Sequence, residues 1–206
     1  MEETTTSHTK KRIFQIATAE FLQKGFRGAS LRAIVKNAGV TTGAFYGYFK
    51  NKEEIFDAIV SPHATELIKI FQKYINEFLA LPKTEWKTDN SRFAHEGMRE
   101  MYDYAEKNKT AFQLILTAAA GTRWEHYLHD IVQQEIDITH RFYAVLEAEG
   151  LKPRALNPTL EHSIISGEFS ALFELIVHDI PREEGLKCVE DIYSFYNAGW
   201  NFMLNS

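Results

Sequence analysis

The 206-residue sequence contains a single cysteine, Cys188, which excludes an internal disulfide and a cysteine-rich zinc site. No stretch approaches the length of apolar sequence that is needed to span a bilayer. The N-terminal MEETTTSHTKKR is polar and lacks the apolar core of a signal peptide. We therefore expect a soluble, cytoplasmic protein, with Cys188 as a small buried apolar side chain.

The sequence also lacks the short motifs of common enzyme classes, namely G-x-S-x-G, the P-loop, GxGxxG and HExxH. We therefore expect neither catalytic activity nor a cofactor. His126 and His129 stand three residues apart on one predicted helix, as two metal ligands would. No third ligand is evident, so a solvated pair on the surface is favoured and no metal site is predicted.

Strand-like alternation of apolar and polar residues is missing as well, and helical spacing dominates the chain. The sequence predicts an all-α fold with short helices in its first quarter. Longer helices are predicted at 52–80, 91–107, 109–120, 124–149, 158–178 and 183–204. Ser61-Pro62 either kinks the first of these or restarts it. Loops are predicted at 82–90 and 150–157.

Charge is distributed unevenly along the chain. Residues 1–52 hold nine Lys or Arg and three acids, a net charge of +6, against −11 for the remaining residues and −5 for the whole chain. A basic head on an acidic body indicates that the head meets a polyanion, although an uneven solvated surface would look the same.

Helix signals in the basic segment are closely spaced. Apolar residues at helical spacing begin at Ile13, and the pattern stops at Gly25. A short helix over 31–38 follows, with Ser30 as its N-cap and Gly39 as its left-handed stop. Such short, well-punctuated helices are typical of a small compact unit.

The next residues continue this pattern. Thr41 is placed to cap a third helix over 42–49, and Asn51 with Glu54 forms a capping box that opens the fourth. The helices 31–38 and 42–49 with the turn between them have the proportions of a helix-turn-helix. In that motif the second helix enters the major groove of DNA with its N-terminal residues near base edges.

The stretch GVTTGAFYGYFKNKEE (residues 39–54) carries aromatic residues on several sides of its short helix. Phe45 and Phe49, four residues apart, fit an inward face. Tyr46 lies on another side, where its ring would reach bases or sugars and its hydroxyl a phosphate. Tyr48 fits either role. A packing unit with a solvated basic face is the alternative to DNA binding, because many short helix pairs imitate this motif.

The stretch IFQIATAEFLQKGFRGASLRAIVKNAGVTTGAFYGYFKNKEEIF resembles the DNA-binding domain of TetR-like transcriptional regulators over residues of about 9–56. The resemblance implies a DNA-binding domain over 1–52 and a helical ligand-binding and dimerisation domain over 53–206. It places a set of residues near DNA bases or phosphates: Ser30, Arg32, Thr41, Thr42, Gly43, Ala44, Tyr46, Tyr48, Lys50 and Lys52. Gly47 stands where the family often has His, so one common contact is absent.

The last two predicted helices are apolar nearly all round, which requires burial on two sides. Along 183–204, one stripe is Leu186, Val189, Tyr193, Tyr196, Trp200 and Met203, and a second is Cys188, Ile192, Phe195, Gly199 and Phe202. Helix 158–178 has two such stripes as well. One side would face the chain's own core and the other a second subunit. The resemblance implies the same homodimer through 158–178 and 183–204, and a helix central to a monomer is the alternative.

The middle helices are rich in large adaptable side chains, which suit an apolar pocket or a plain core. The resemblance implies a small-molecule inducer in such a pocket. Two acids stand on otherwise apolar faces: Glu135 among Ile131 and Ile138, and Glu168 among Ile164 and Leu172. Such acids would suit a lipophilic cation, unless a partner within the protein or water satisfies them. The predicted ligand residues are Met98, Met101, Tyr102, Phe112, Trp124, Tyr127, Glu135, Phe142, Glu168, Phe169 and Phe173.

The sequence therefore favours a ligand-responsive transcriptional regulator, a repressor that binds a palindromic operator as a homodimer. The main alternative is a DNA-bound architectural or protein-partner module without an inducer. Small ligands would stabilise only the first, because stabilisation requires a binding site in the folded state.

Overall fold

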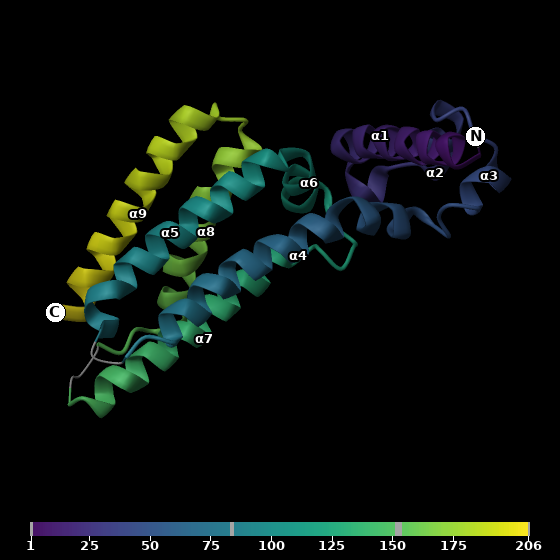
Figure 1. Cartoon of the computed structure of the whole chain (residues 1–206). Helices are drawn as coiled ribbons and strands as arrows, with labels where there is room; N and C mark the ends of the chain where they lie inside the picture. The colour runs from purple at the N-terminus through teal and green to yellow at the C-terminus, as the bar shows by residue number, and fades with distance from the viewer. Residues whose placement is uncertain (1, 83–84, 151–153, 206) are drawn as a thin grey trace. The chain divides into compact units, whose positions relative to one another are not determined.

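The computed structural model describes residues 2–82, 85–150 and 154–205, and these residues form helices joined by turns, with no strand among them (Figure 1). The all-α class predicted from the sequence is confirmed. The helices are α1 (Glu2–Gly28), α2 (Leu31–Asn37), α3 (Thr42–Tyr46), α4 (Lys52–Leu79), α5 (Trp86–Lys107), α6 (Lys109–Gln113), the π-helical turn η2 (Leu114–Ala118), α7 (Tyr127–Ala148), α8 (Pro158–Val177) and α9 (Arg182–Asn205).

The chain packs as two compact units. The first comprises residues 1–65 and 108–125, and the second comprises residues 66–107 and 126–206. This division differs from the domain boundary expected after residue 52, because the start of α4 and the segment with α6 and η2 belong to the first unit. The helix α4 contributes to both units. Pro62 lies within this one continuous helix, which answers the question of whether it restarts the element.

The short helices α2 and α3 of the first unit begin where their capping residues predict. Gly25 has a φ of 68° and interrupts the helical geometry of α1. The Ser30 hydroxyl accepts a hydrogen bond from the Ala33 amide at 3.4 Å, which caps α2. Gly39, with a φ of 62°, turns the chain after α2.

The caps of α3 and α4 follow the same chemistry, with one difference. Thr41 Oγ1 accepts from the Ala44 amide at 3.1 Å, and Asn51 Oδ1 accepts from the Glu54 amide at 2.8 Å. The Glu54 carboxylate reaches back to the amide of Lys50, at 2.5 Å, rather than to that of Asn51. The capping box is therefore displaced by one residue, and the helix begins at the predicted place.

Two buried or half-buried charges join the elements of the first unit. The Glu20 carboxylate on α1 accepts from Lys24 Nζ at 2.8 Å and from the Ser30 amide at 3.0 Å. These hydrogen bonds lower the pKa of Glu20, so the carboxylate stays ionised and holds the start of α2 against α1. Lys52 Nζ donates to the carbonyls of Phe26 at 2.5 Å and of Ala29 at 3.0 Å, which ties the start of α4 to the end of α1.

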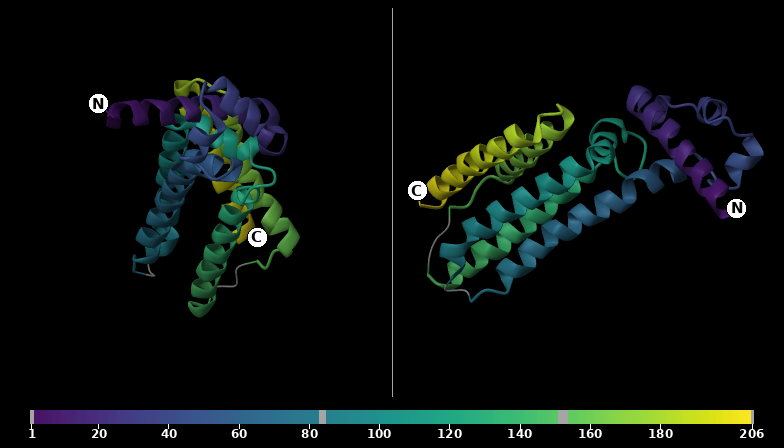
Figure 2. Two further views of the ribbon diagram at one scale, coloured as in Figure 1. Left: turned by 90° about the vertical axis from the view of Figure 1, so that its right-hand side faces the viewer. Right: turned by 45° about the horizontal axis from the view of Figure 1, so that its top comes forward.

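In the second unit α7 packs along α8, and α5 packs along α9, with α8 also touching α5 and α9 (Figures 1 and 2). One aromatic cluster joins three of its helices: Phe78 of α4, Phe93 of α5, and Phe142 and Leu146 of α7. Phe78 lies 6.3 Å from Phe93 and 6.0 Å from Phe142, measured between ring centroids. The cluster holds α4, α5 and α7 together at one end of the helices.

Three of the longer helices have bounds that differ from the predicted ones, each for a local reason. The helix α5 begins at Trp86, inside the loop expected over 82–90, because polar residues without proline do not stop a helix. Over 109–120, α6 gives way to η2 after Gln113. The helix α7 begins at Tyr127 rather than at 124, because the chain turns at Gly121 with a φ of 91°. Within the described ranges, no helix combines the length and the apolar character that crossing a membrane would require.

Candidate functional sites

The N-terminal end of α3 is an open surface of small side chains. Thr41, Thr42, Gly43 and Ala44 are all exposed, and an added Cβ at Gly43 would meet no atom within 4 Å. Small exposed groups at a helix N-terminus allow another molecule to approach the main-chain amides closely. This surface is therefore suited to a phosphate or a base edge.

The aromatic residues around α3 divide between core and surface as the sequence predicts. Phe45 and Phe49 are buried, and Phe49 lies 5.5 Å from Phe14 of α1 between ring centroids. The Tyr46 side chain is 53% exposed and leaves its hydroxyl free of the core. Helix α3 ends at Tyr46, not at residue 49, so Tyr48 lies in the turn that follows and is half-buried.

The predicted phosphate contacts lie in different environments. Arg32 and Lys50 are both exposed, and they lie before and after α3 along the chain. The Ser30 hydroxyl already accepts a hydrogen bond as the cap of α2. Lys52 differs, because its ammonium is committed to the carbonyls at the end of α1 and lies 4.5 Å from the centroid of the Phe26 ring. The structure therefore assigns Lys52 to holding α4 on α1, and leaves Lys50 as the exposed cation.

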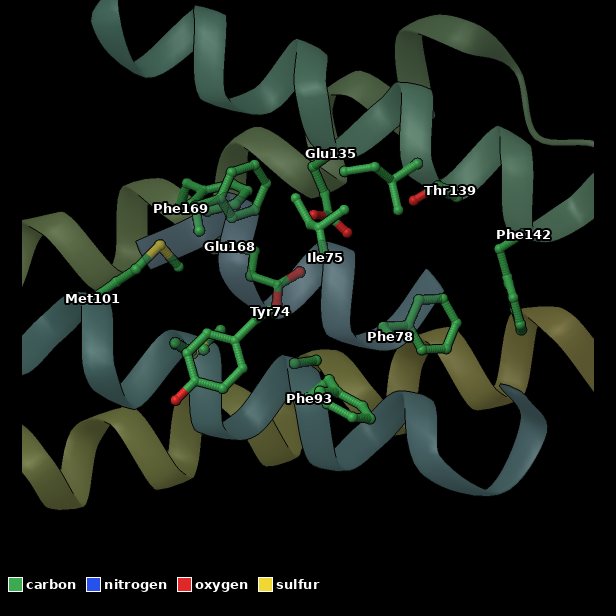
Figure 3. A pocket seen from close by; sticks show the side chains of 15 residues that line it. Tyr74, Ile75, Phe78, Phe93, Met101, Glu135, Thr139, Phe142, Glu168 and Phe169 are labelled. Atoms are coloured by element: carbon green, nitrogen blue, oxygen red, sulfur yellow. The ribbon is translucent and has the colours of Figure 1, made fainter. Parts of the chain in front are cut away.

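The second unit contains a cavity of about 130 Å³ between α4, α5, α7 and α8 (Figure 3). Its wall is largely aromatic and aliphatic, with two carboxylates. The lining residues are Phe71, Tyr74, Ile75 and Phe78 of α4, Phe93, Ala94, Gly97, Met98 and Met101 of α5, Glu135, Ile138, Thr139 and Phe142 of α7, and Glu168 and Phe169 of α8.

Six of the predicted ligand residues line this cavity: Met98, Met101, Glu135, Phe142, Glu168 and Phe169. The other five do not: Tyr102, Phe112, Trp124, Tyr127 and Phe173. Phe112 and Trp124 belong to the first unit, and the indole of Trp124 donates to Asp57 Oδ1 at 2.9 Å. Tyr102, Tyr127 and Phe173 are buried in the second unit as core residues.

Sequence reasoning missed the contribution of α4 to this cavity. Phe71, Tyr74, Ile75 and Phe78 recur at steps of three and four, so they form one helical face. The sequence shows that spacing, but apolar residues that pack in a core and apolar residues that line a cavity have the same helical spacing. Tyr74 lines the cavity, and its hydroxyl donates to Glu100 Oε2 at 2.6 Å. This hydrogen bond holds the ring in place.

The carboxylates of Glu135 and Glu168 point toward one another from α7 and α8 (Figure 3). Burial raises the pKa of Glu135 to about 7, and the neighbouring Glu168 carboxylate adds to the shift. Burial likewise raises the pKa of Glu168 to about 7, against the opposing effect of a hydrogen bond from Trp200. Among the described residues that line the cavity there is no Lys, Arg or His to neutralise the pair.

Comparison with known proteins identifies the first unit's helices. The sequence model described as "Bacterial regulatory proteins, tetR family" matches residues 13–59, the segment that holds α2, α3 and the start of α4. Residues 13–59 are therefore a TetR-family DNA-binding segment. The helix-turn-helix predicted from the spacing of Ser30, Gly39 and Thr41 lies within this matched segment.

Two relatives show how far the sequence similarity extends. The HTH-type transcriptional regulator YdgC of Bacillus subtilis is 35% identical over 69 residues, 34% of this chain and 35% of YdgC. The HTH-type transcriptional regulator AcrR of Shigella flexneri is 43% identical over 51 residues, 25% of this chain and 24% of AcrR. The match thus spans about a third or less of these relatives' length.

The fold is similar over nearly the whole chain. The transcriptional regulator FadR of Bacillus subtilis, solved in complex with stearoyl-CoA, aligns with 90% of this chain and 96% of its own. The TM-score is 0.55 and the identity is 14%. At that identity the likeness shows a shared fold.

The last two helices of the chain, α8 and α9, leave apolar residues uncovered. On α9, Phe195 is 73% exposed and Phe202 is 71% exposed, and a Cβ at Gly199 between them would meet no atom within 4 Å. On α8, Leu160 is exposed too. Cys188, expected to be buried, is only half-buried on this same side of α9. The second stripe predicted from the sequence is therefore an open apolar surface in the protomer.

The histidines that stood out in the sequence form no metal site in the described part of the chain. His129 lies beside His162 of α8, with 3.3 Å between His129 Nδ1 and His162 Nε2, and both rings are at the surface. Across the described residues, no group of three or more His, Cys, Asp or Glu side chains is arranged to hold a metal ion. His126 precedes α7 as its N-terminal boundary residue.

Proposed function

We propose that this protein is a ligand-responsive transcriptional repressor that binds a palindromic DNA operator as a homodimer and leaves it when a small molecule fills the cavity of the second unit. The observation that carries the proposal is the exposed N-terminal surface of α3, within the segment that matches the TetR family. Small side chains there admit the DNA backbone, and Tyr46 presents an exposed ring to the groove.

Dimerisation is supported by the uncovered apolar surface of α8 and α9. An isolated protomer that exposed Leu160, Phe195 and Phe202 together would gain by burying them against a second copy. A two-fold dimer also explains why one chain carries a single helix-turn-helix, since two copies read two half-sites about one helical turn apart.

The chemistry of the cavity favours a lipophilic cation as the inducer. Two carboxylates without a basic neighbour in the described cavity wall leave a negative charge to be neutralised by the ligand or by protons. The surrounding rings of Phe71, Phe142 and Phe169 add apolar contact and a favourable site for positive charge. A coenzyme A ester, which FadR holds, is an anion and would be repelled by Glu135 and Glu168.

The proposal is tested by two measurements on the same protein. Incubation with benzyltributylammonium, a permanently charged hydrophobic cation, should raise the melting temperature, because a ligand that binds only the folded state stabilises it. The same cation should weaken binding to the DNA that flanks the protein's own gene. Stabilisation by neither cations nor other small molecules, with DNA binding intact, would favour the module without an inducer.

A further inference from the structure

A second cavity, of about 110 Å³, also borders the two carboxylates. It is lined from four helices: Ala94 of α5, Glu135, Thr139, Phe142 and Tyr143 of α7, Ile165 and Glu168 of α8, and Tyr193, Asn197 and Trp200 of α9. Five of these residues also line the first cavity: Ala94, Glu135, Thr139, Phe142 and Glu168. The carboxylates therefore stand at the junction of two cavities, not at the end of one.

Each cavity has aromatic side chains that do not line the other. The first has the rings of Phe71, Phe78 and Phe93, and the second has those of Tyr193 and Trp200, of which Trp200 also donates a hydrogen bond to Glu168. Cavities of roughly 150 Å³ accept a benzene ring, so each of these two matches one ring or a short branched alkyl group. The two carboxylates are thus shared by two cavities, each of which has its own aromatic side chains.

Trp200 donates a hydrogen bond to Glu168, but no cationic side chain in the described cavity walls balances the two carboxylates. Tyr74 of α4 lines the first cavity, and its hydroxyl donates to Glu100. Tyr143 on α7 and Tyr193 on α9 line the second cavity. Burial, and to a lesser extent the Glu168 charge, raises the pKa of Tyr196 on α9. Neither cavity has a Lys, Arg or His in the part of its wall that the structure describes. A ligand must therefore supply the positive charge, and the second carboxyl can keep a proton.

A cation with its charge at one end would leave one cavity empty. A cation with its charge between two apolar groups would fill both and place its nitrogen at the junction. We propose that the site takes an N-substituted ammonium ion that carries apolar groups on two sides of the nitrogen, one in each cavity. This inference rests on the proposed function of the cavity as the inducer site, and it adds the shape of the ligand.

Two permanently charged probes distinguish this shape from cation binding in general. Dibenzyldimethylammonium carries two rings about its nitrogen, and benzyltrimethylammonium carries one. Isothermal titration should show the two-ring probe binding at least about tenfold more tightly to the wild-type protein, since a second buried ring adds apolar contact. Equal affinities would overturn the two-cavity inference and leave the cationic inducer standing. Failure of both probes to bind would refute the cationic inducer as well.

A variant that fills only the second cavity localises the effect. Asn197 lines that cavity alone, so Asn197→Phe should reduce the affinity of the two-ring probe to that of the one-ring probe. The one-ring probe, seated in the larger cavity, should change less than about threefold. Equal losses for both probes would contradict the assignment. A crystal structure with a doubly brominated two-ring probe provides an independent check on the wild-type protein: bromine in each cavity is expected, and both bromines in one cavity would overturn it.

Discussion

The Glu135 carboxylate of α7 and the Glu168 carboxylate of α8 both line two cavities. Burial raises the pKa of each, and the Glu168 charge adds to the rise at Glu135. Two buried carboxylates without a cationic partner destabilise the empty protein once they ionise. The same pair gives a bound cation more than one favourable charge. Binding of a cation should therefore remove the destabilisation that the ionised carboxylates cause in the empty protein.

Stability should depend on pH through this pair. The folded pKa of each carboxyl, about 7, lies above its ordinary value of 4.5, so the folded state keeps protons that the unfolded state has released between these values. The contribution is fully present below pH 4.5 and is lost as pH rises through about 7, by up to about 1.4 kcal/mol per pH unit for each carboxyl.

The measurement is the melting temperature of the wild type relative to a Glu135→Gln/Glu168→Gln variant from pH 5 to pH 8. The wild type should lose stability against this variant as pH rises. Cation affinity should change in the opposite direction and increase through pH 7. A constant difference in melting temperature across the range would show that the pair is not buried together as described.

Lys50 and Lys52 should separate DNA binding from folding. Lys50 is exposed, so Lys50→Ala should weaken binding to all DNA sequences and make the dependence of log K on log salt shallower by about one unit. Lys52 holds carbonyls at the end of α1, so Lys52→Met should lower the free energy of unfolding by roughly 1–3 kcal/mol. Fluorescence anisotropy and urea unfolding measure the two effects. A stable Lys52→Met variant with a reduced salt slope would restore a phosphate role for Lys52.

Tyr46 and Phe45 should behave differently although they are neighbours. Phe45 is fully buried, and Phe45→Ala should destabilise the first unit by about 3–5 kcal/mol. Tyr46→Ala should cost less than about 1 kcal/mol, because the ring is largely exposed, yet it should change the preference among operator variants. Binding to a library of randomised half-sites gives the readout. An unchanged preference would place Tyr46 outside the groove.

A carboxylate introduced by substitution on the exposed apolar face of α9 should dissociate the proposed dimer into monomers. Gly199 has space for a side chain in the protomer, so Gly199→Glu should fold normally but bury an unpaired charge in the proposed interface, at a cost of several kcal/mol. Sedimentation velocity should show monomers with greatly reduced operator affinity. Ala144→Glu, on the exposed side of α7, is the matched control and should remain dimeric. A Gly199→Glu protein that remained dimeric would exclude this face of α9 as the dimer interface.

Local chemistry explains how much of the first unit the sequence could predict. The caps at Ser30, Thr41 and Asn51 depend on neighbours within four residues, and each is confirmed. The role of Lys52 could not be predicted, because its partners lie 23 to 26 residues earlier in the chain. Long-range hydrogen bonds of this kind leave no periodic pattern in a sequence.

The second unit shows the same limit for its cavity. Glu135 and Glu168 stood out because a carboxylate on an apolar helix face needs a partner, and the structure places both in one wall. Trp124 was expected on that face because the helical spacing continues back to it, but Gly121 turns the chain and α7 begins at Tyr127. Aromatic spacing marks a buried face, whereas the arrangement of four helices decides which buried face borders a cavity.

The central claim is that a cation held by Glu135 and Glu168 controls DNA binding. The most direct measurement is fluorescence anisotropy of a labelled operator duplex, selected by the wild-type protein from random DNA, during titration with dibenzyldimethylammonium at pH 7.5. Release is expected from the wild type, and the Glu135→Gln/Glu168→Gln variant should bind the same duplex with unchanged affinity and require at least about tenfold more cation. Equal release from both proteins, or no release from the wild type, would contradict the account.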